Sequence, residues 1–304
     1  LPTATSLVVM KVPGESSNQP SPKLIGSYAK DVIQLHENDS LLNLKFADLA
    51  TDVTVHVAFG KTSTDFDRRL TEGQQHAPRS MTTGGRAQWA QKTVTTVGTR
   101  GDNDSAFAID TLTIPFAAEN PFGTPMRLAG VGSLPNGRMV VSTLLGDVWM
   151  VTGVNDDLQH LTWQRIAAGL YQPLGLVIQD GKVVLGGNDQ VTRLHDFNGD
   201  GEADFYECVT NEYPTTGGHD FATSLQQDNQ GRLYWATASG DFGVAQLATG
   251  TRPVSLGNGL RNSSGIGVSA DGSIVLATVQ EGSWTPATAI FNVRNGSFHG
   301  HNGP

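Results

Sequence analysis

Short runs of alternating apolar and polar residues recur along the chain and predict β-strands separated by turns. Before residue 60 there are five such runs: SLVVMKV (6–12), KLIGSYA (23–29), DVIQL (31–35), LLNLKFA (41–47) and DVTVHVAF (52–59). Each run has the length of a strand and is bounded by polar residues, glycine or proline. The pattern predicts a β-sandwich-like domain over residues 1–85.

A short helix is expected at the end of this domain. Within STDFDRRLTEG (63–73), Ser63 or Thr64 can cap the first turn and Gly73 can end the last one. These signals predict a helix near residues 64–72. Two further strands are expected after it, QKTVTTVG (91–98) and AFAIDTLTIP (106–115).

Beyond Pro125 a turn followed by two β-runs is repeated four times, in LPNGRMVVSTLLGDVWMV, QDGKVVLGGNDQVTRLHD, QDNQGRLYWATASGDFGVAQL and SADGSIVLATVQEGSWTPATAIFNV. The turn glycines are spaced 44, 50 and 41 residues apart and are Gly137, Gly181, Gly231 and Gly272. A period of about 40 to 50 residues is typical of β-propeller blades. The chain is therefore predicted to be all-β, with a propeller over residues 86–304 and four recognisable blades over 126–296. A sandwich with evenly spaced turns is the alternative.

Composition narrows the classes of partner and metal site. Of the 304 residues, 20 are basic and 29 acidic, which gives a net charge of −9, and no basic run is present. A nucleic-acid partner is therefore not expected. No apolar run approaches the roughly 18 residues of a membrane span. The single cysteine, Cys208, excludes an internal disulfide, and no motif for zinc or covalently attached haem is present.

The stretch DFNGDGEADFYE (196–207) matches a twelve-residue calcium loop at every position. Gly201 occupies the sharp turn at position 6. Positions 1, 3, 5, 7, 9 and 12 are Asp196, Asn198, Asp200, Glu202 (through its carbonyl), Asp204 and Glu207. The flanking runs have the character of strands, so the pattern predicts a structural Ca²⁺ site in a hairpin. A solvated acidic turn is the alternative.

Several long motifs carry a family resemblance: GDVWMV, LTWQRIAAGLYQPLGLVIQDGKV, DQVTRLHDFNGDGEADFYE, GGHDFATSLQQDNQGRLYWA and EGSWTPATAIFNVRNGSFHG. Between about Trp89 and Gly300 the chain resembles the propellers of exported bacterial proteins related to the glucose/sorbosone dehydrogenases. The resemblance implies a six-bladed propeller and a periplasmic or extracellular location. Such relatives continue into further blades, so an incomplete propeller is expected here.

The same resemblance implies one catalytic alternative. In pyrroloquinoline-quinone sugar dehydrogenases a channel histidine is the general base, and His219 in GGHDFATS is the candidate for that role. Arginine and lysine side chains hold the quinone carboxylates, and Arg193 is a candidate. A structural histidine, bonded to the backbone of a neighbouring blade, is the competing interpretation of His219.

An incomplete ring leaves open strand edges, which invite association and are normally covered. Three arrangements would cover them: further blades, if the chain is a fragment of a longer protein, the N-terminal strands, or another subunit. The third arrangement favours a non-catalytic, calcium-stabilised accessory or scaffold subunit on the outer face of a larger complex, such as a membrane-bound electron-transfer assembly. Under this hypothesis no residue is catalytic and the partners are protein subunits. The alternative is a quinone-dependent sugar dehydrogenase.

Overall fold

The computed structural model describes residues 83–301, and before them the backbone of five short strands. Within 83–301 the undescribed residues are 103, 105, 117–118, 136, 156, 213–220, 238–242 and 282–286. The chain divides into two units, Leu1–Thr83 and Gly84–Pro304. The helix predicted near residues 64–72 and the candidate base His219 both lie outside the described residues.

Five strands are described in the first unit, one in each of the runs expected before residue 60. An antiparallel sheet has the order β1-β4-β3, and a smaller pair joins β2 to β5. The bounds are β1 (Ser6–Met10), β2 (Lys23–Leu24), β3 (Ile33–Asn38), β4 (Leu41–Phe46) and β5 (Val57–Ala58). The sandwich-like packing of this unit stays a prediction.

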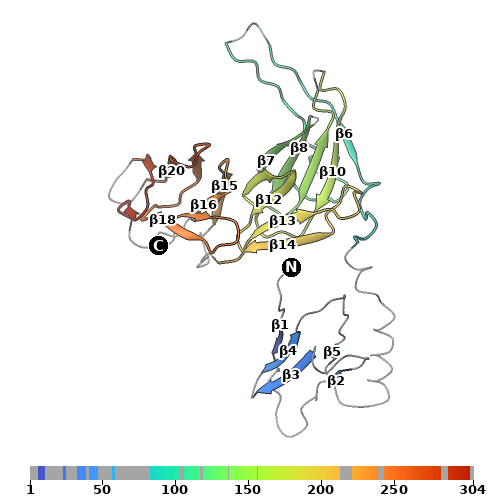
Figure 1. Cartoon of the computed structure of the whole chain (residues 1–304). Helices are drawn as coiled ribbons and strands as arrows, with labels where there is room; N and C mark the ends of the chain where they lie inside the picture. Colours follow the sequence, from blue (N-terminus) through green and yellow to red (C-terminus); the bar gives the residue numbers. More distant parts are fainter. Residues whose placement is uncertain are drawn as a thin grey trace. The chain divides into compact units, whose positions relative to one another are not determined.

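The described residues of the second unit form four sheets that follow one another along the chain, here called blades 1 to 4 (Figure 1). Blade 1 has the order β6-β10-β9-β8-β7: β6 (Val94–Thr96), β7 (Leu128–Leu134), β8 (Arg138–Thr143), β9 (Val148–Thr152) and β10 (Leu161–Ala167). Blade 2 is built from β11 (Gly175–Gln179), β12 (Lys182–Gly186), β13 (Val191–His195) and β14 (Phe205–Thr210).

Blade 3 is built from β15 (Ala222–Gln227), β16 (Leu233–Thr237), β17 (Val244–Leu247) and β18 (Val254–Asn258), with β22 (Ser297–Phe298) added in parallel to β18. Blade 4 is built from β19 (Gly265–Val268), β20 (Val275–Val279) and β21 (Ala289–Asn292). The described part of the chain contains no α-helix, and hence none with the length and hydropathy of a membrane span. The all-β, propeller-like prediction is therefore confirmed.

Each of the four turn glycines of the sequence repeat lies in the turn of the first hairpin of a blade. Their φ angles are 67°, 74°, 75° and 72° for Gly137, Gly181, Gly231 and Gly272. Backbone at these angles is costly for residues with a Cβ atom, which explains why each turn uses glycine. The spacing of these glycines thus reports the spacing of the blades.

Three apolar cores hold neighbouring blades together. Val148 and Ile166 of blade 1 pack with Leu176 and Leu185 of blade 2. The core between blades 2 and 3 includes Val177, Val184, Leu225 and Trp235, and the core between blades 3 and 4 includes Tyr234, Ala236, Ile266, Val275 and Ala277. A strand between two cores is apolar on both faces, as in LYWAT of β16, all of which is buried.

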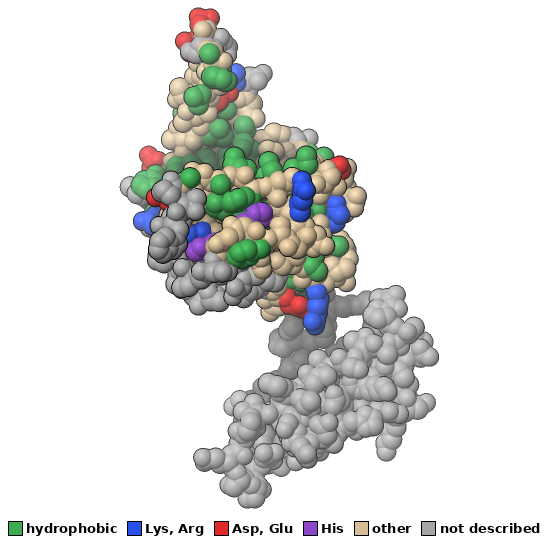
Figure 2. All heavy atoms as spheres, turned by 90° about the vertical axis from the view of Figure 1, so that its left-hand side faces the viewer, with side chains coloured by type: hydrophobic (Ala, Val, Ile, Leu, Met, Phe, Trp, Pro, Cys, Tyr) green, Lys and Arg blue, Asp and Glu red, His purple; other side chains and the backbone are tan. Residues whose placement is uncertain are grey.

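The outer faces of blades 1 and 4 differ. Trp149 and Trp163 of blade 1 are covered by preceding residues that include Leu112, Ile114 and Phe122. On the corresponding face of blade 4, Ile274, Leu276 and Ile290 are 48%, 39% and 70% exposed. Figure 2 looks onto the side that carries blade 4 and shows hydrophobic side chains on this surface. Among the described residues, none covers this apolar face of blade 4.

One predicted strand is absent. Residues 106–115 were expected to form a strand, but their backbone pairs at a single bridge, Thr99 with Thr111. Past that bridge the chain projects from blade 1 as an arm (Figure 1). A strand needs a neighbouring ladder for its N–H and C=O groups, and no described strand lies beside this segment. The preceding expectation, at residues 91–98, is met by β6.

Candidate functional site

The predicted calcium loop connects β13 to β14 in blade 2. His195 pairs with Phe205 at the base of the loop, and the N–H of Asp204 donates to the carbonyl of His195 at 2.8 Å. Gly199 and Gly201 have φ angles of 75° and 89°, which let the chain reverse twice in a few residues. The loop is therefore a tight hairpin connection between strands.

Side-chain oxygens of the loop are directed onto its own backbone. Asp196 accepts hydrogen bonds from the N–H groups of Gly199 and Gly201 at 2.7 and 2.9 Å. The amide oxygen of Asn198 accepts from the N–H of Asp200 at 2.9 Å, and Asp200 accepts from the N–H of Glu202 at 3.0 Å. The alternate positions predicted as ligands thus lie in one small loop and present hard oxygen donors, which are the donors that Ca²⁺ prefers.

Asp204 connects this loop to the start of the second unit. One carboxylate oxygen accepts from the N–H of Gly85 at 2.8 Å, and the other accepts from the N–H of Phe197 at 2.8 Å. The amide nitrogen of Asn198 donates to the carbonyl of Gly85. At Gly84, where φ is 85°, an added Cβ atom would overlap the Asp204 carboxylate. The loop and the segment 84–89 are therefore fitted closely to each other.

Glu202 makes the deepest contact between the loop and this segment. It is 7% exposed, and its carboxylate accepts from the N–H groups of Gln88 and Trp89 at 2.7 and 2.5 Å. The sequence suggested a role for its carbonyl alone. The second role was missed because Gln88 and Trp89 precede Glu202 by 114 and 113 residues, and no local pattern joins them.

Glu207 lies apart from the other predicted ligands. It is on β14, opposite Arg193, and its carboxylate contacts Arg193 at 3.1 Å and His195 at 2.6 Å. The hydrogen bond from His195, followed by that from Arg193, holds the pKa of Glu207 below its usual value. Among the described side chains, no three His, Cys, Asp or Glu residues form a ready metal cluster. Calcium therefore stays a prediction, resting on the loop donors at positions 196 to 204.

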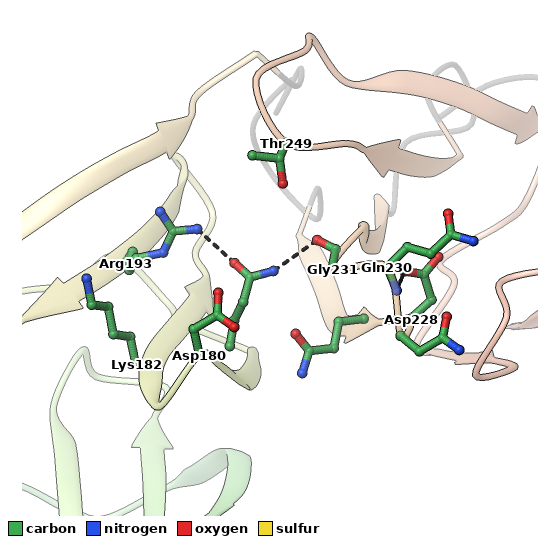
Figure 3. A pocket seen from close by; sticks show the side chains of 10 residues that line it. Asp180, Lys182, Arg193, Asp228, Gln230, Gly231 and Thr249 are labelled. Atoms are coloured by element: carbon green, nitrogen blue, oxygen red, sulfur yellow. Dashed lines mark hydrogen bonds between the residues drawn. The ribbon is translucent and has the colours of Figure 1, made fainter. Parts of the chain in front are cut away.

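A polar cavity of about 660 Å³ lies beside this ion pair, between blades 2 and 3. Arg193 and Lys182 lie on one side of it, and Gly231 and Asp228 on the other (Figure 3). Gln179 spans the two blades: it accepts from Arg193 at 2.8 Å and donates to the carbonyl of Gly231 at 2.9 Å. These bonds fasten one blade to the next.

The cations of this cavity are already engaged. Arg193 is bound by Glu207 and Gln179, and Lys182 Nζ is 3.3 Å from His195 Nδ1. A second cavity, of about 420 Å³, is lined by Phe221, which follows His219 by two residues. Arg193 does not line that cavity. The structure thus does not bring the candidate clamp Arg193 to the residues that follow the candidate base.

The second cavity lies between blades 3 and 4, and most of its accessible lining is apolar, with a few amide and hydroxyl groups among the apolar ones. Asn262 donates to the side-chain oxygen of Gln280 at 2.8 Å, and Thr223 donates to the carbonyl of Ser263. The Ser263 hydroxyl is fully buried, with no hydrogen-bond partner among the described residues. A mostly apolar lining with a few polar groups is typical of small-molecule sites.

No protein-family model matches the chain, and no curated protein matches its sequence. Solved structures similar in fold include a putative oxidoreductase (glucose dehydrogenase) from Thermus thermophilus, at 17% identity over 58% of this chain and 64% of that one, with a TM-score of 0.45. A gluconolactonase from Xanthomonas campestris matches at 15% identity over 57% and 61%, with a TM-score of 0.43. Dihydro-heme d1 dehydrogenase matches at 12% identity over 77% and 53%, with a TM-score of 0.37. The chain spans less than two thirds of the length of each of these structures.

Proposed function

We propose that the chain is a non-catalytic, calcium-stabilised β-propeller that acts as an accessory or scaffold subunit of a larger protein complex. The observation that carries this proposal is the open apolar face of blade 4. In the described part of the second unit, blades 1, 2 and 3 pack against their neighbouring blades. The outer face of blade 1 is covered by residues that precede it in the chain. A partner protein would do the same for blade 4.

The open face has the composition of a packed surface. In β20, VLATV alternates between positions directed to blade 3 and positions directed outward, and both sets include aliphatic side chains. Leu276 on β20 and Ile290 on β21 lie on the outward face, because Ile290 pairs with Thr278, two residues from Leu276. Adjoining exposed aliphatic groups on a sheet are typical of protein interaction sites.

Calcium would supply rigidity to this subunit. Asp196, Asn198, Asp200 and Asp204 offer side-chain oxygens, and Glu202 offers its carbonyl, so a bound Ca²⁺ would offset the repulsion among the loop carboxylates. The same loop holds segment 84–89 against blade 2 through Asp204 and Glu202. The metal would therefore act on the shape of the propeller. The family resemblance supports a periplasmic location, and the outer face of a membrane-bound electron-transfer complex is the setting that we propose.

The test is the association state of the protein extracted from its own cell in mild detergent. We expect it to migrate within an assembly much larger than its own chain, and Leu276→Asp to release it. The matched control is Leu145→Asp, an exposed leucine in a turn of blade 1. The proposal would be wrong if the wild-type chain migrated alone, or if the Leu276→Asp variant stayed in the assembly as well as the wild type does.

A second candidate function is a quinone-dependent sugar dehydrogenase. The observation that favours it is the 420 Å³ cavity, which is lined by Phe221, two residues after His219, and which has amide and hydroxyl groups among its apolar lining that could hold a hydroxylated substrate. Arg193 would have no part in this site. Purified protein with pyrroloquinoline quinone and an aldose should then reduce a dye, and His219→Ala should abolish the turnover. That result would replace the scaffold proposal.

A further inference from the structure

The arm that projects from blade 1, residues 99–111, is closed by its own backbone at the root. The N–H of Thr99 donates to the carbonyl of Thr111 at 2.9 Å, and the N–H of Thr111 donates back at 2.8 Å. Gly101 then approaches the opposite side so closely that a Cβ atom would overlap the backbone of Ile109. The two sides of the arm are therefore close together from Thr99 to Gly101 on one side and from Ile109 to Thr111 on the other.

The root of the arm is fastened to the core of blade 1. The indole N–H of buried Trp163 donates to the Thr96 hydroxyl at 2.9 Å, and that hydroxyl donates to the carbonyl of Thr113 at 2.5 Å. The N–H of Gly98 donates to the carbonyl of Leu158 at 2.7 Å. These bonds hold both sides of the root, so the arm presents its tip from a fixed base.

The arm carries the most exposed large apolar side chains of the described residues. Phe107 is 83% exposed and Ile109 is 74% exposed. Single exposed apolar residues are ordinary on a protein surface. Here, however, a phenylalanine and an isoleucine lie two positions apart on the same arm, and both are exposed. Aromatic groups presented in this way are typical of side chains that a partner protein buries.

The tip of the arm is acidic. Asp110 forms an ion pair with Arg100 at 3.4 Å. The carboxylate of Asp102 accepts a hydrogen bond from the N–H of Asp104 at 2.9 Å, and no ion pair of Asp102 is found among the described residues. One arginine against three aspartates leaves residues 100–110 with a net charge of −2. Figure 2 shows acidic side chains at the end of this projection and hydrophobic ones below them.

We infer that the arm docks into a partner protein whose apolar groove, rimmed by lysine or arginine, takes Phe107 and Ile109. Charge decides among the possible occupants. A second copy of this chain, at −9 overall, and an anionic lipid surface would both repel the acidic tip. This inference rests on the proposed function and names a surface for it, distinct from the open face of blade 4.

Photo-crosslinking in the native cell tests the inference. The full chain carries p-benzoylphenylalanine at Phe107, or at Tyr171 as a control, since Tyr171 is also an exposed aromatic residue but lies on the body of the propeller. We expect the Phe107 position, and not the Tyr171 position, to crosslink to one protein, at a peptide that contains aliphatic residues beside lysine or arginine. Crosslinking to a second copy, to lipid, or equally from both positions would overturn it.

Affinity measurements with the crosslinked protein, once purified, make the test quantitative. Phe107→Ser should weaken binding at least tenfold, whereas Val97→Ser, at an exposed valine beside the root, should leave it unchanged. Asp102→Asn with Asp104→Asn should weaken binding several-fold at low salt and less at high salt. Equal affinity of Phe107→Ser and wild type would overturn the inference.

The two proposals fail in distinguishable ways. If the chain stays in its assembly with Phe107→Ser but is released by Leu276→Asp, the role of the arm is wrong and the scaffold function stands. If wild-type protein is alone in the cell extract and neither position crosslinks to protein, both are wrong.

Discussion

The carboxylate of Asp204 accepts a hydrogen bond from the backbone N–H of Gly85, 119 residues earlier in the chain, at 2.8 Å. A loop whose sequence suggests local metal binding therefore also makes a long-range contact. The second oxygen of the Asp204 carboxylate accepts a hydrogen bond from the N–H of Phe197 within the loop. One side chain therefore orders both the loop and the segment at Gly85. Substitutions in the loop that disturb Asp204 should therefore also affect the segment at residues 84–89.

Calcium should stabilise the folded protein through this loop. Asp200→Ala removes a central donor, so the melting temperature of this variant should be the same with calcium and with chelator. The wild type should melt higher in calcium, by an increment that corresponds to about 2.7 kcal/mol at a hundredfold excess over the dissociation constant. Differential scanning calorimetry with and without calcium measures both.

The matched control for this experiment is Asp157→Ala. Asp157 is exposed in another turn, where its carboxylate accepts from the N–H of Gln159 at 3.0 Å. This variant should keep the calcium response of the wild type. Identical wild-type melting curves in calcium and in chelator would refute the metal site.

A side chain at Gly84 should disturb the contact with Asp204. Gly84 and Gly123 both have left-handed φ angles, 85° and 65°, but an added Cβ atom overlaps the Asp204 carboxylate at Gly84 and meets nothing at Gly123. Alanine at either position should cost about 1–2 kcal/mol from the backbone conformation alone. Gly84→Ala should cost more, and urea denaturation measures the difference.

The excess cost of Gly84→Ala should disappear in an Asp204→Ala background, because the overlap is then removed. A double-mutant cycle isolates this coupling. Equal destabilisation by Gly84→Ala in both backgrounds would show that the carboxylate is not the obstacle.

The blade repeat could be predicted because its signals are local. The turn at Gly181 joins two strands whose register follows directly, with Gln179 paired to Lys182, and a left-handed φ angle there requires glycine. Apolar residues on both faces of a strand, as in β16, likewise report burial between two blades. Local geometry thus yields the blades without any knowledge of their packing.

Contacts between distant segments could not be predicted from the same signals. Glu202 binds the N–H groups of Gln88 and Trp89, and this becomes visible only when blade 2 and segment 84–89 are side by side. At residues 106–115 the sequence predicted a strand that is absent. The alternating apolar residues suit a strand, but the pattern does not reveal whether a neighbouring strand exists. Glu207 fitted the calcium spacing, while the β13–β14 register pairs it with Arg193.

Acid should weaken the fold partly through Asp228, whose side chain is fully buried. Burial raises its pKa, but hydrogen bonds from Arg232 at 2.5 Å, from the Tyr234 hydroxyl at 2.9 Å and from two backbone N–H groups outweigh it, so the pKa lies below its usual value. A carboxyl group with a lowered pKa stabilises the folded state above its unfolded pKa of about 3.9, and this contribution is lost as the pH falls below that value.

Asp228→Asn should therefore lower the free energy of unfolding at pH 7 by about 1–3 kcal/mol, since it leaves buried donors poorly matched. Its deficit relative to wild type should shrink between about pH 4 and pH 2. Urea titrations across this range measure the gap, with Asp157→Asn as the exposed control. A gap that stays constant down to about pH 2 would contradict the role assigned to the Asp228 charge.

The Thr96 hydroxyl should stabilise blade 1 because it connects Trp163 to the far side of the arm's root. Thr96→Val has a similar shape but leaves the buried indole N–H of Trp163 and the carbonyl of Thr113 without this partner, which should cost about 1–3 kcal/mol. Thr96→Ser keeps the hydroxyl and loses one methyl group, a cost of about 0.8 kcal/mol. Urea denaturation followed by tryptophan fluorescence should rank wild type above Ser and Ser above Val. If Val proves as stable as Ser, the hydroxyl does not hold the root, and the fixed base assigned to the arm is wrong.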